Sequence, residues 1–121
     1  MAKKILIIDD EKDAVSGVAM RLEATGYQVI GAYNGPDGLK LAMEQKPRLI
    51  LLDLMMPGMD GFEVLRKLKA NDQTRNIPVI IFSCKGESDA IFKTQDLGSV
   101  DYIIKPFESQ ELLDLVKRHI L

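Results

Sequence analysis

Two short apolar runs end in aspartates, and this pattern restricts the fold more than any other feature of the chain. Ile5–Ile8 is followed directly by Asp9 and Asp10, and Leu49–Leu52 is followed by Asp53. A fully apolar run of this length is typical of a strand buried on both faces of a parallel sheet. Charged side chains cannot lie inside such a sheet, so we expect them just beyond the carboxyl ends of the strands, where open α/β sheets bind ligands.

Strand-like and helix-like segments alternate along the whole sequence. We predict strands at Lys4–Ile8, Gln28–Tyr33, Arg48–Leu52, Pro78–Phe82 and Asp101–Ile104. We predict helices at Glu11–Thr25, from Asn34-Gly35-Pro36 to Lys46-Pro47, from the cap Asp60 through Leu68, at about Glu87–Leu97, and from the cap Ser109 through His119. Gly26 and Gly98 are expected to end the first and fourth helices, and the spacing of Asp60 and Glu63 is that of a capping box.

This alternation predicts right-handed crossovers and a parallel sheet with helices on both faces. The expected fold is α/β, with a five-stranded parallel sheet in the order 2-1-3-4-5, doubly wound with five helices and flavodoxin-like. In that order the first and third strands are neighbours at the switch point, about 4.8 Å apart. The aspartates that follow these two strands should then lie close enough to share one small cation.

Length and composition agree with one domain, residues 1–121. The 16 Lys and Arg residues and 18 Asp and Glu residues give a formal net charge of −2, which argues against a nucleic-acid surface. One cysteine fits a reducing compartment. The apolar stretches are shorter than a membrane-spanning helix requires, and we find no signal-peptide pattern. We therefore expect a cytoplasmic protein that binds neither membranes nor nucleic acids.

Three carboxylates in one cleft require a cation. At about 4 Å and an effective dielectric constant near 20, each pair repels by roughly 4 kcal/mol. Oxygen ligands without His or Cys favour Mg²⁺ or Mn²⁺ over zinc. The alternative for Asp10 is that it only caps the following helix. Ser83 and Lys105 follow the fourth and fifth strands and should reach the same edge, which suggests phosphoryl transfer with Asp53 as nucleophile.

These motifs together resemble a known family over the entire chain. Asp9-Asp10, Asp53 with the following segment 54–61 (Leu-Met-Met-Pro-Gly-Met-Asp-Gly), Ser83, and Lys105-Pro106-Phe107 resemble the receiver domain of bacterial two-component response regulators. A receiver domain is itself a standard example of the 2-1-3-4-5 order. The expected strand order and the resemblance are therefore not independent.

The resemblance implies a phospho-acceptor site. It implies that Asp53 takes a phosphoryl group from the phosphohistidine of a sensor histidine kinase or histidine phosphotransfer protein. It also implies that Asp10 and Asp53 bind Mg²⁺ directly, that Asp9 does so directly or through water, and that the backbone carbonyl of Met55 completes the protein ligands. The domain would assist its own phosphorylation and dephosphorylation without being an enzyme in the usual sense.

The resemblance also implies a conformational switch. Ser83 and Lys105 would each contact a phosphoryl oxygen, and the ring of Tyr102 would turn inward as the hydroxyl is drawn to the phosphate. The surface around the fourth helix, fifth strand and fifth helix, including Ile91 and Phe92, would then control a downstream protein or output domain. We expect a monomer or a weak, phosphorylation-dependent dimer.

Several positions leave alternatives open. Cys84 stands where the family usually has a small residue such as alanine, and it either narrows access for the donor or is a small buried hydrophobe. Met55 and Lys85 match positions that tune phosphoryl lifetime. Two other functions are considered: a receiver-like docking module that is not phosphorylated, and a phosphohydrolase of the haloacid dehalogenase type with an aspartate nucleophile. The latter class resembles Asp-x-Asp-x-Thr after its first strand, which Asp9–Asp13 does not match.

Overall fold

The computed structural model describes residues 2–84 and 86–121, and five parallel strands form its central sheet. The strands are β1 (Lys4–Ile8), β2 (Gln28–Ala32), β3 (Leu49–Leu52), β4 (Val79–Ser83) and β5 (Asp101–Ile104). Their order in the sheet is β2-β1-β3-β4-β5. The fold class and strand order expected from the sequence are therefore confirmed.

The register of the sheet places the ends of β1 and β3 side by side. Ile8 pairs with Leu52, and the Asp53 N–H donates to the Ile8 carbonyl over 3.0 Å. The Asp9 N–H continues the ladder on the other side by donating to the Ala32 carbonyl over 3.0 Å. Because backbone pairing continues to the first residue after each strand, both aspartates leave the sheet at a fixed position on its carboxyl edge.

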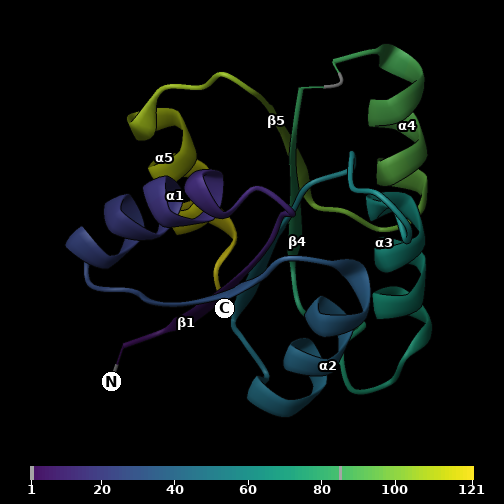
Figure 1. The fold of residues 1–121 in the computed structure, drawn as a ribbon, viewed down its shortest axis with the longest axis horizontal. Coiled ribbons are helices and arrows are strands. Elements are labelled where there is room, and N and C mark those ends of the chain that lie inside the picture. The colour runs from purple at the N-terminus through teal and green to yellow at the C-terminus, as the bar shows by residue number, and fades with distance from the viewer. Residues whose placement is uncertain (1, 85) are drawn as a thin grey trace.

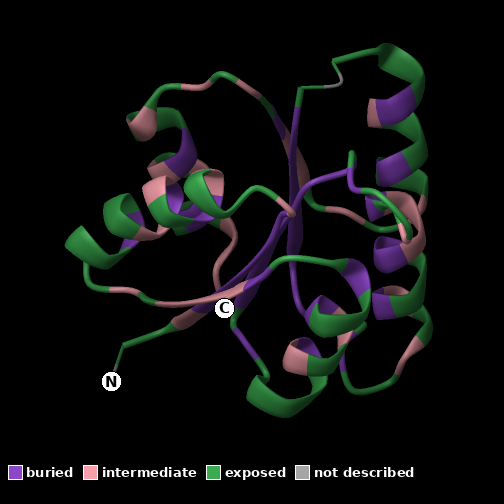
Figure 2. Cartoon of the chain, viewed as in Figure 1, coloured by how far each residue is buried: buried purple, intermediate pink, exposed green. Residues whose placement is uncertain are grey.

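In the described part of the chain, five helices cover the two faces of the sheet. They are α1 (Lys12–Ala24), α2 (Gly35–Gln45), α3 (Gly61–Ala70), α4 (Ser88–Asp96) and α5 (Ser109–His119). Helices α1 and α5 lie on one side of the sheet, and α2, α3 and α4 lie on the other (Figure 1). The helices are buried on the side that meets the sheet and exposed on the outer side, as expected of amphipathic helices (Figure 2).

Two hydrophobic cores fill the spaces between the sheet and the helices. Alternate strand residues face opposite sides, so Ile7, Ile80 and Phe82 belong to the core under α1 and α5. Ile8 and Ile81 belong to the core under α2, α3 and α4. Both faces of the central strands are thus apolar and fully buried, which is why β1 and β3 appear as continuous apolar runs in the sequence.

The helix ends agree with the expected signals in most places. The Asp60 side chain accepts from the Glu63 N–H over 3.0 Å at the start of α3. Gly26 and Gly98 follow α1 and α4 with φ angles of +98° and +106°, a conformation that favours glycine. The prediction that Ser109 caps α5 is wrong. Ser109 is the first helical residue, and the extended backbone of the preceding Glu108 starts the helix without a side-chain cap.

The strand boundary at the functional edge also differs from the prediction. We expected the fourth strand to span Pro78–Phe82 with Ser83 directly after it, but β4 is Val79–Ser83 and buries Ser83 completely. The ladder to β5 continues there, because Ser83 pairs with Ile104 and its carbonyl accepts from the Lys105 N–H over 2.9 Å. Tertiary pairing therefore extends the strand by one polar residue beyond the apolar run.

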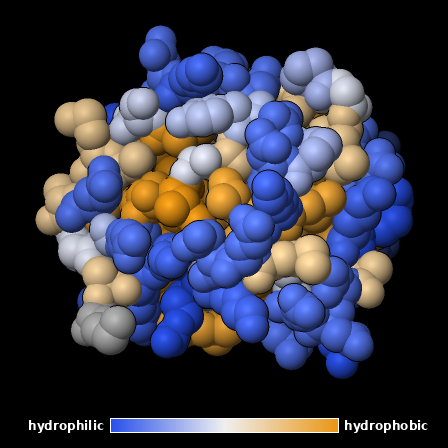
Figure 3. All heavy atoms as spheres, turned by 60° about the horizontal axis from the view of Figure 1, so that its bottom comes forward, coloured by the Kyte–Doolittle hydropathy of each residue, from blue (hydrophilic) through white to orange (hydrophobic). Residues whose placement is uncertain are grey.

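The surface is mixed in character. On the face shown in Figure 3, hydrophilic side chains lie between and around the apolar areas. Among residues 2–84 and 86–121, we find no helix that is long and apolar enough to cross a membrane.

Candidate functional site

Three aspartates meet at the carboxyl edge of the sheet, as the sequence pattern predicts. Asp9, Asp10 and Asp53 each offer a carboxylate oxygen, and these oxygens lie within 4.8 Å of one another. Asp9 is completely buried and Asp53 is only 4% exposed. The N-cap position of α1 is Glu11, not Asp10, so the alternative of Asp10 as a simple helix cap does not hold. The site is thus an acidic cluster built on two neighbouring strands.

Asp9 is the most firmly held of the three carboxylates. Its Oδ1 accepts from the Glu11 N–H over 3.0 Å, and its Oδ2 accepts from the Lys105 ammonium over 2.8 Å. Lys105 follows β5, and the Lys105–Pro106 peptide bond is cis. The sequence places Lys105 on the same edge, and the structure shows that its ammonium reaches Asp9 after β1, past the ends of β4 and β3.

Asp53 is held less tightly than Asp9. Its Oδ1 accepts from the Met55 N–H over 3.3 Å, and its Oδ2 lies 3.8 Å from the Lys105 ammonium. Burial raises the pKa of Asp53 from 3.8 to about 6, and the neighbouring Asp9 and Asp10 add to this rise. The Lys105 charge and the Met55 N–H oppose the rise in the Asp53 pKa without cancelling it. Ionisation of Asp53 therefore costs more free energy than ionisation of an ordinary, exposed aspartate.

Lys105 remains a cation in this environment. Burial alone would lower the pKa of Lys105, but the hydrogen bond to Asp9 and the charges of Asp53 and Asp9 together raise that pKa above its ordinary value. The ammonium also lies 4.4 Å from the centre of the Phe82 ring. Among the residues that the structure describes here, Lys105 thus places one positive charge beside three acids, which leaves an excess of negative charge.

The acidic cluster fits a divalent cation with oxygen ligands. An octahedral Mg²⁺ has oxygen ligands at about 2.0–2.1 Å, so ligands on opposite sides of the ion are about 4.2 Å apart. The aspartate oxygens, which lie within 4.8 Å of one another, have a spread close to that distance. Asp9, Asp10 and Asp53 are hard donors, and the Met55 peptide lies beside them through its bond to Asp53.

Ser83 and Tyr102 lie on the other face of the sheet from Phe82. Ser83 is completely buried, and Tyr102 is half-buried against the core under α2, α3 and α4. A hydrogen bond joins the two side chains. Burial raises the pKa of Tyr102, and the bond to Ser83 acts in the opposite direction. Ser83 and Tyr102 are therefore already linked in this structure, on the side of α4.

Gly61, the last residue of the motif that follows Asp53, is part of the site through its backbone. A Cβ atom at Gly61 would overlap the backbone carbonyl of Asp53 and lie 2.5 Å from the Leu54 Cα atom. The Gly61 N–H donates to the Leu54 carbonyl over 3.0 Å. The start of α3 can therefore rest directly against the Asp53 backbone only because position 61 has no side chain.

The sequence also singles out Cys84, Lys85, Ile91 and Phe92. Cys84 is exposed, so its interpretation as a small buried hydrophobe is wrong; the residue lies just beyond the last buried position of β4. Lys85 lies outside the described residues. On α4, Ile91 is partly buried whereas Phe92 is 62% exposed, which leaves Phe92 available on the surface.

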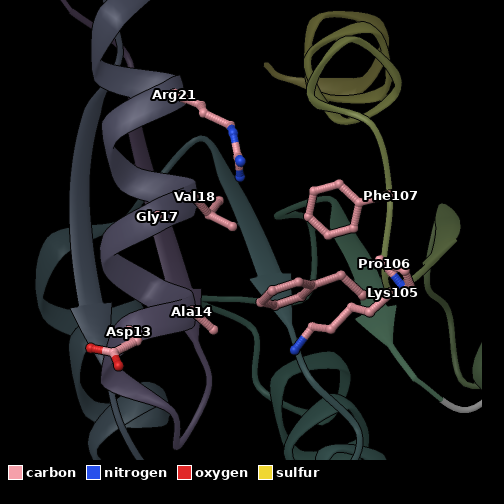
Figure 4. A pocket seen from close by; sticks show the side chains of 9 residues that line it. Asp13, Ala14, Gly17, Val18, Arg21, Lys105, Pro106 and Phe107 are labelled. Atoms are coloured by element: carbon pink, nitrogen blue, oxygen red, sulfur yellow. The ribbon is translucent and has the colours of Figure 1, made fainter.

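A groove opens beside Lys105 between α1 and the segment that follows β5. It has a volume of about 330 Å³ and is lined by residues of both segments, among them Ala14, Val18 and Arg21 of α1 and Phe107. In Figure 4, these α1 side chains face Lys105 and Phe107 across the opening. A partner that binds in this groove would lie next to the acidic cluster.

Comparison with known proteins decides the family. Residues 5–117 match the family described as the response regulator receiver domain. The chain belongs to this family. The receiver domain is 40% identical to the phosphate regulon transcriptional regulatory protein PhoB of Pseudomonas aeruginosa, over 97% of this chain and 51% of that protein. It is 38% identical to sporulation initiation phosphotransferase F of Bacillus subtilis, over 99% of this chain and 95% of that protein.

Structural comparison gives the same result. The receiver domain matches the solved structure of chemotaxis protein CheY4 of Vibrio cholerae with a TM-score of 0.94 and 25% identity, covering 99% of this chain and all of that one. The chain spans about half of the Pseudomonas relative and nearly all of the Bacillus relative. It is a signalling domain of the kind that is phosphorylated on an aspartate in two-component systems, where receiver domains interact with histidine kinases, phosphotransfer proteins or output domains.

Proposed function

We propose that Asp53 is the phospho-acceptor of this domain. Its contacts with the Met55 N–H and with Lys105, at 3.3 and 3.8 Å, are longer than the contacts that hold Asp9. This difference carries the assignment, because a nucleophile needs an oxygen that can leave its present partner. An Asp53 oxygen would attack the phosphorus of the donor; the new O–P bond forms as the P–N bond of the phosphohistidine breaks, and the electron pair remains on the imidazole nitrogen.

The acidic cluster would hold the divalent ion that this chemistry needs. Asp10 and Asp53 would bind Mg²⁺ directly, Asp9 directly or through water, and Met55 through its backbone carbonyl; Mn²⁺ is the alternative ion. When bound, the ion neutralises charge on the carboxylates and on the transferred group. The chain itself keeps Asp9 in place through Glu11 and Lys105, which supports its role as a fixed anchor of the site.

Lys105 and Ser83 would bind phosphoryl oxygens and convert phosphorylation into a conformational change. A population shift from about 1:99 to 99:1 needs about 5.5 kcal/mol, and a hydrogen bond to a charged group contributes roughly 1.5–3 kcal/mol. Because Lys105 already lies 3.8 Å from Asp53, only part of its new contact adds to the shift. Ser83 is bonded to Tyr102, so movement of Ser83 toward the phosphoryl group would also move Tyr102.

The surface beyond Tyr102 would report the state of Asp53. Phe92, Val100 and Ile104 are 62%, 42% and 46% exposed on α4, on the segment before β5, and on β5. This surface would control a downstream protein or output domain, as a monomer or through a weak dimer that depends on phosphorylation. Light scattering of the protein with and without phosphorylation would distinguish these two states.

The phosphodonor would dock over the groove between α1 and Phe107. The lining of the groove combines apolar side chains with the charged Asp13 and Arg21 and reaches Lys105, so a phosphohistidine presented there would arrive beside Asp53. The donor would be a sensor histidine kinase or a histidine phosphotransfer protein.

In this proposal, residues 1–121 act as one receiver domain in the cytoplasm, and the domain assists both its own phosphorylation and its own dephosphorylation.

One experiment separates this function from its alternatives. The protein is incubated with Mg²⁺ and acetyl phosphate, and we expect an acid-stable, base-labile phosphate that is lost in Asp53→Asn and retained in the surface control Asp96→Asn. Labelling that survives in Asp53→Asn would contradict the assignment of the acceptor. Binding of a kinase without any labelling would indicate a docking module, whereas sustained turnover of small phosphate esters would indicate a phosphohydrolase.

A further inference from the structure

The ammonium group of Lys105 rests against an aromatic ring as well as against acids. Its Nζ atom lies 4.4 Å from the centre of the Phe82 ring, 2.8 Å from Asp9 Oδ2 and 3.8 Å from Asp53 Oδ2. The Lys105 side chain is only 17% exposed, so little water surrounds the charge. A lysine ammonium over a ring face is attracted by the ring quadrupole, and the attraction grows as water is removed.

Phe82 is rigidly held. It is completely buried, and it belongs to the core that also contains Ile80, Ile103 and Leu112. Its ring therefore cannot follow a moving lysine, whereas the Lys105 side chain has four flexible bonds. One partner of the Lys105 ammonium is thus a fixed part of β4, at the edge of the sheet where the acids lie.

We propose that Phe82 is a positioning residue, whose ring holds the Lys105 ammonium where it meets a phosphoryl group on Asp53. A cation held by Asp9 would compete with Lys105 for that carboxylate. Asp53 in turn changes its charge distribution when it is phosphorylated. Of the three partners Asp9, Asp53 and Phe82, the ring of Phe82 is the one that neither cation binding nor phosphorylation changes. It therefore keeps Lys105 at the site before and after both events.

This inference rests on the proposed function, since it concerns the residue that would bind the transferred phosphoryl group. It also assigns a role to the type of side chain at position 82. An aliphatic side chain of similar size would fill the same space in the core but would not attract the ammonium. The contribution of the ring is therefore electronic, and it can be separated from its contribution to packing.

Fluorinated phenylalanines at position 82 make this separation. Each added fluorine weakens the negative face of the ring and changes its shape little. We measure the rate of labelling by acetyl phosphate for phenylalanine and for its mono-, tri- and pentafluoro analogues at position 82, with thermal unfolding of each protein. The expected result is a stepwise fall in rate of about 5-fold over the series, without a parallel fall in Tm.

Two controls address packing. The same analogues at position 62, on α3, where the ring lies 4.4 Å from the Lys93 ammonium, should leave the labelling rate unchanged. Ile80→Val trims the same core two residues earlier on β4 and should lower stability without changing the rate, whereas Phe82→Leu should lower both. If the rate follows Tm in every variant, Phe82 acts only through packing and the inference is overturned.

Proton NMR of Lys105 gives a readout that does not depend on activity. In the unmodified protein, the ring should shift the ε-methylene protons of Lys105 upfield, and this shift should disappear in Phe82→Leu. Absence of that difference would contradict the contact itself. Failure of the unmodified protein to be labelled at all would overturn the proposed function together with this inference, whereas labelling that is insensitive to fluorination would overturn this inference alone.

Discussion

Replacing Asp53 with asparagine should stabilise the metal-free protein above about pH 6. The cause is the buried acidic cluster, which raises the pKa of Asp53 from 3.8 to about 6 in the folded state. Between these two values the folded protein binds more protons at this position than the unfolded chain does. The free energy of unfolding is therefore greatest below pH 3.8, the pKa of Asp53 in the unfolded chain. It falls as the pH rises through about 6, the pKa of Asp53 in the folded protein.

The size of the effect follows from the difference between the two pKa values. About two pH units, at about 1.4 kcal/mol for each, give roughly 3 kcal/mol of unfolding free energy lost when Asp53 ionises. Asparagine has nearly the same shape and cannot ionise. We therefore expect Asp53→Asn to be more stable than the unmodified protein by up to about 3 kcal/mol near pH 8, and by close to zero near pH 4.

Urea unfolding with a chelator present, repeated from about pH 4 to about pH 8, measures this difference directly. Asp96→Asn serves as the control, because it removes an exposed carboxylate from α4, outside the acidic cluster. Addition of Mg²⁺ should then stabilise the unmodified protein and Asp96→Asn, but should stabilise Asp53→Asn much less. A stability difference that does not grow with pH, or an Asp53→Asn protein that is less stable near pH 8, would refute the reasoning.

Three further predictions test the elements that support the site. Gly61→Ala should lower the free energy of unfolding by at least about 2 kcal/mol and slow labelling, because the new Cβ overlaps the Asp53 backbone. Urea unfolding and the acetyl phosphate assay check this, and unchanged values would show that α3 can shift without cost. Asp60→Ala should cost about 1 kcal/mol of unfolding free energy through loss of the cap on the Glu63 N–H, and an equal loss in Asp60→Asn would show that the charge matters more than the cap. Lys69→Met should cost about 1–3 kcal/mol, since its ammonium donates to two loop carbonyls over 3.0 and 2.8 Å; amide exchange should increase in residues 75–77, and unchanged exchange there would contradict this role.

Local sequence signals were sufficient for most of the fold. Apolar runs, helical spacing and turn residues predicted all five strands and five helices, and the topological rules for crossovers predicted the order of the sheet. Three predictions failed near element boundaries: Ser109 is a common cap residue but is the first residue of α5, Ser83 is polar but is the last residue of β4, and Cys84 is apolar but is exposed beyond β4. At β4 the boundary is set by tertiary pairing, because Ser83 pairs with Ile104 of β5.

The sequence by itself also determined the acidic cluster, because Asp9, Asp10 and Asp53 directly follow strands whose neighbours are set by topology. Only the tertiary structure decided how the other groups meet them. Lys105 bonds to Asp9 from 96 residues away, and its ammonium lies over the ring of Phe82, whose apolar character had predicted no more than a strand. Distances between such groups depend on register and helix packing, and the raised pKa of Asp53 depends on burial. No short stretch of the chain specifies these distances or the burial that raises the pKa of Asp53.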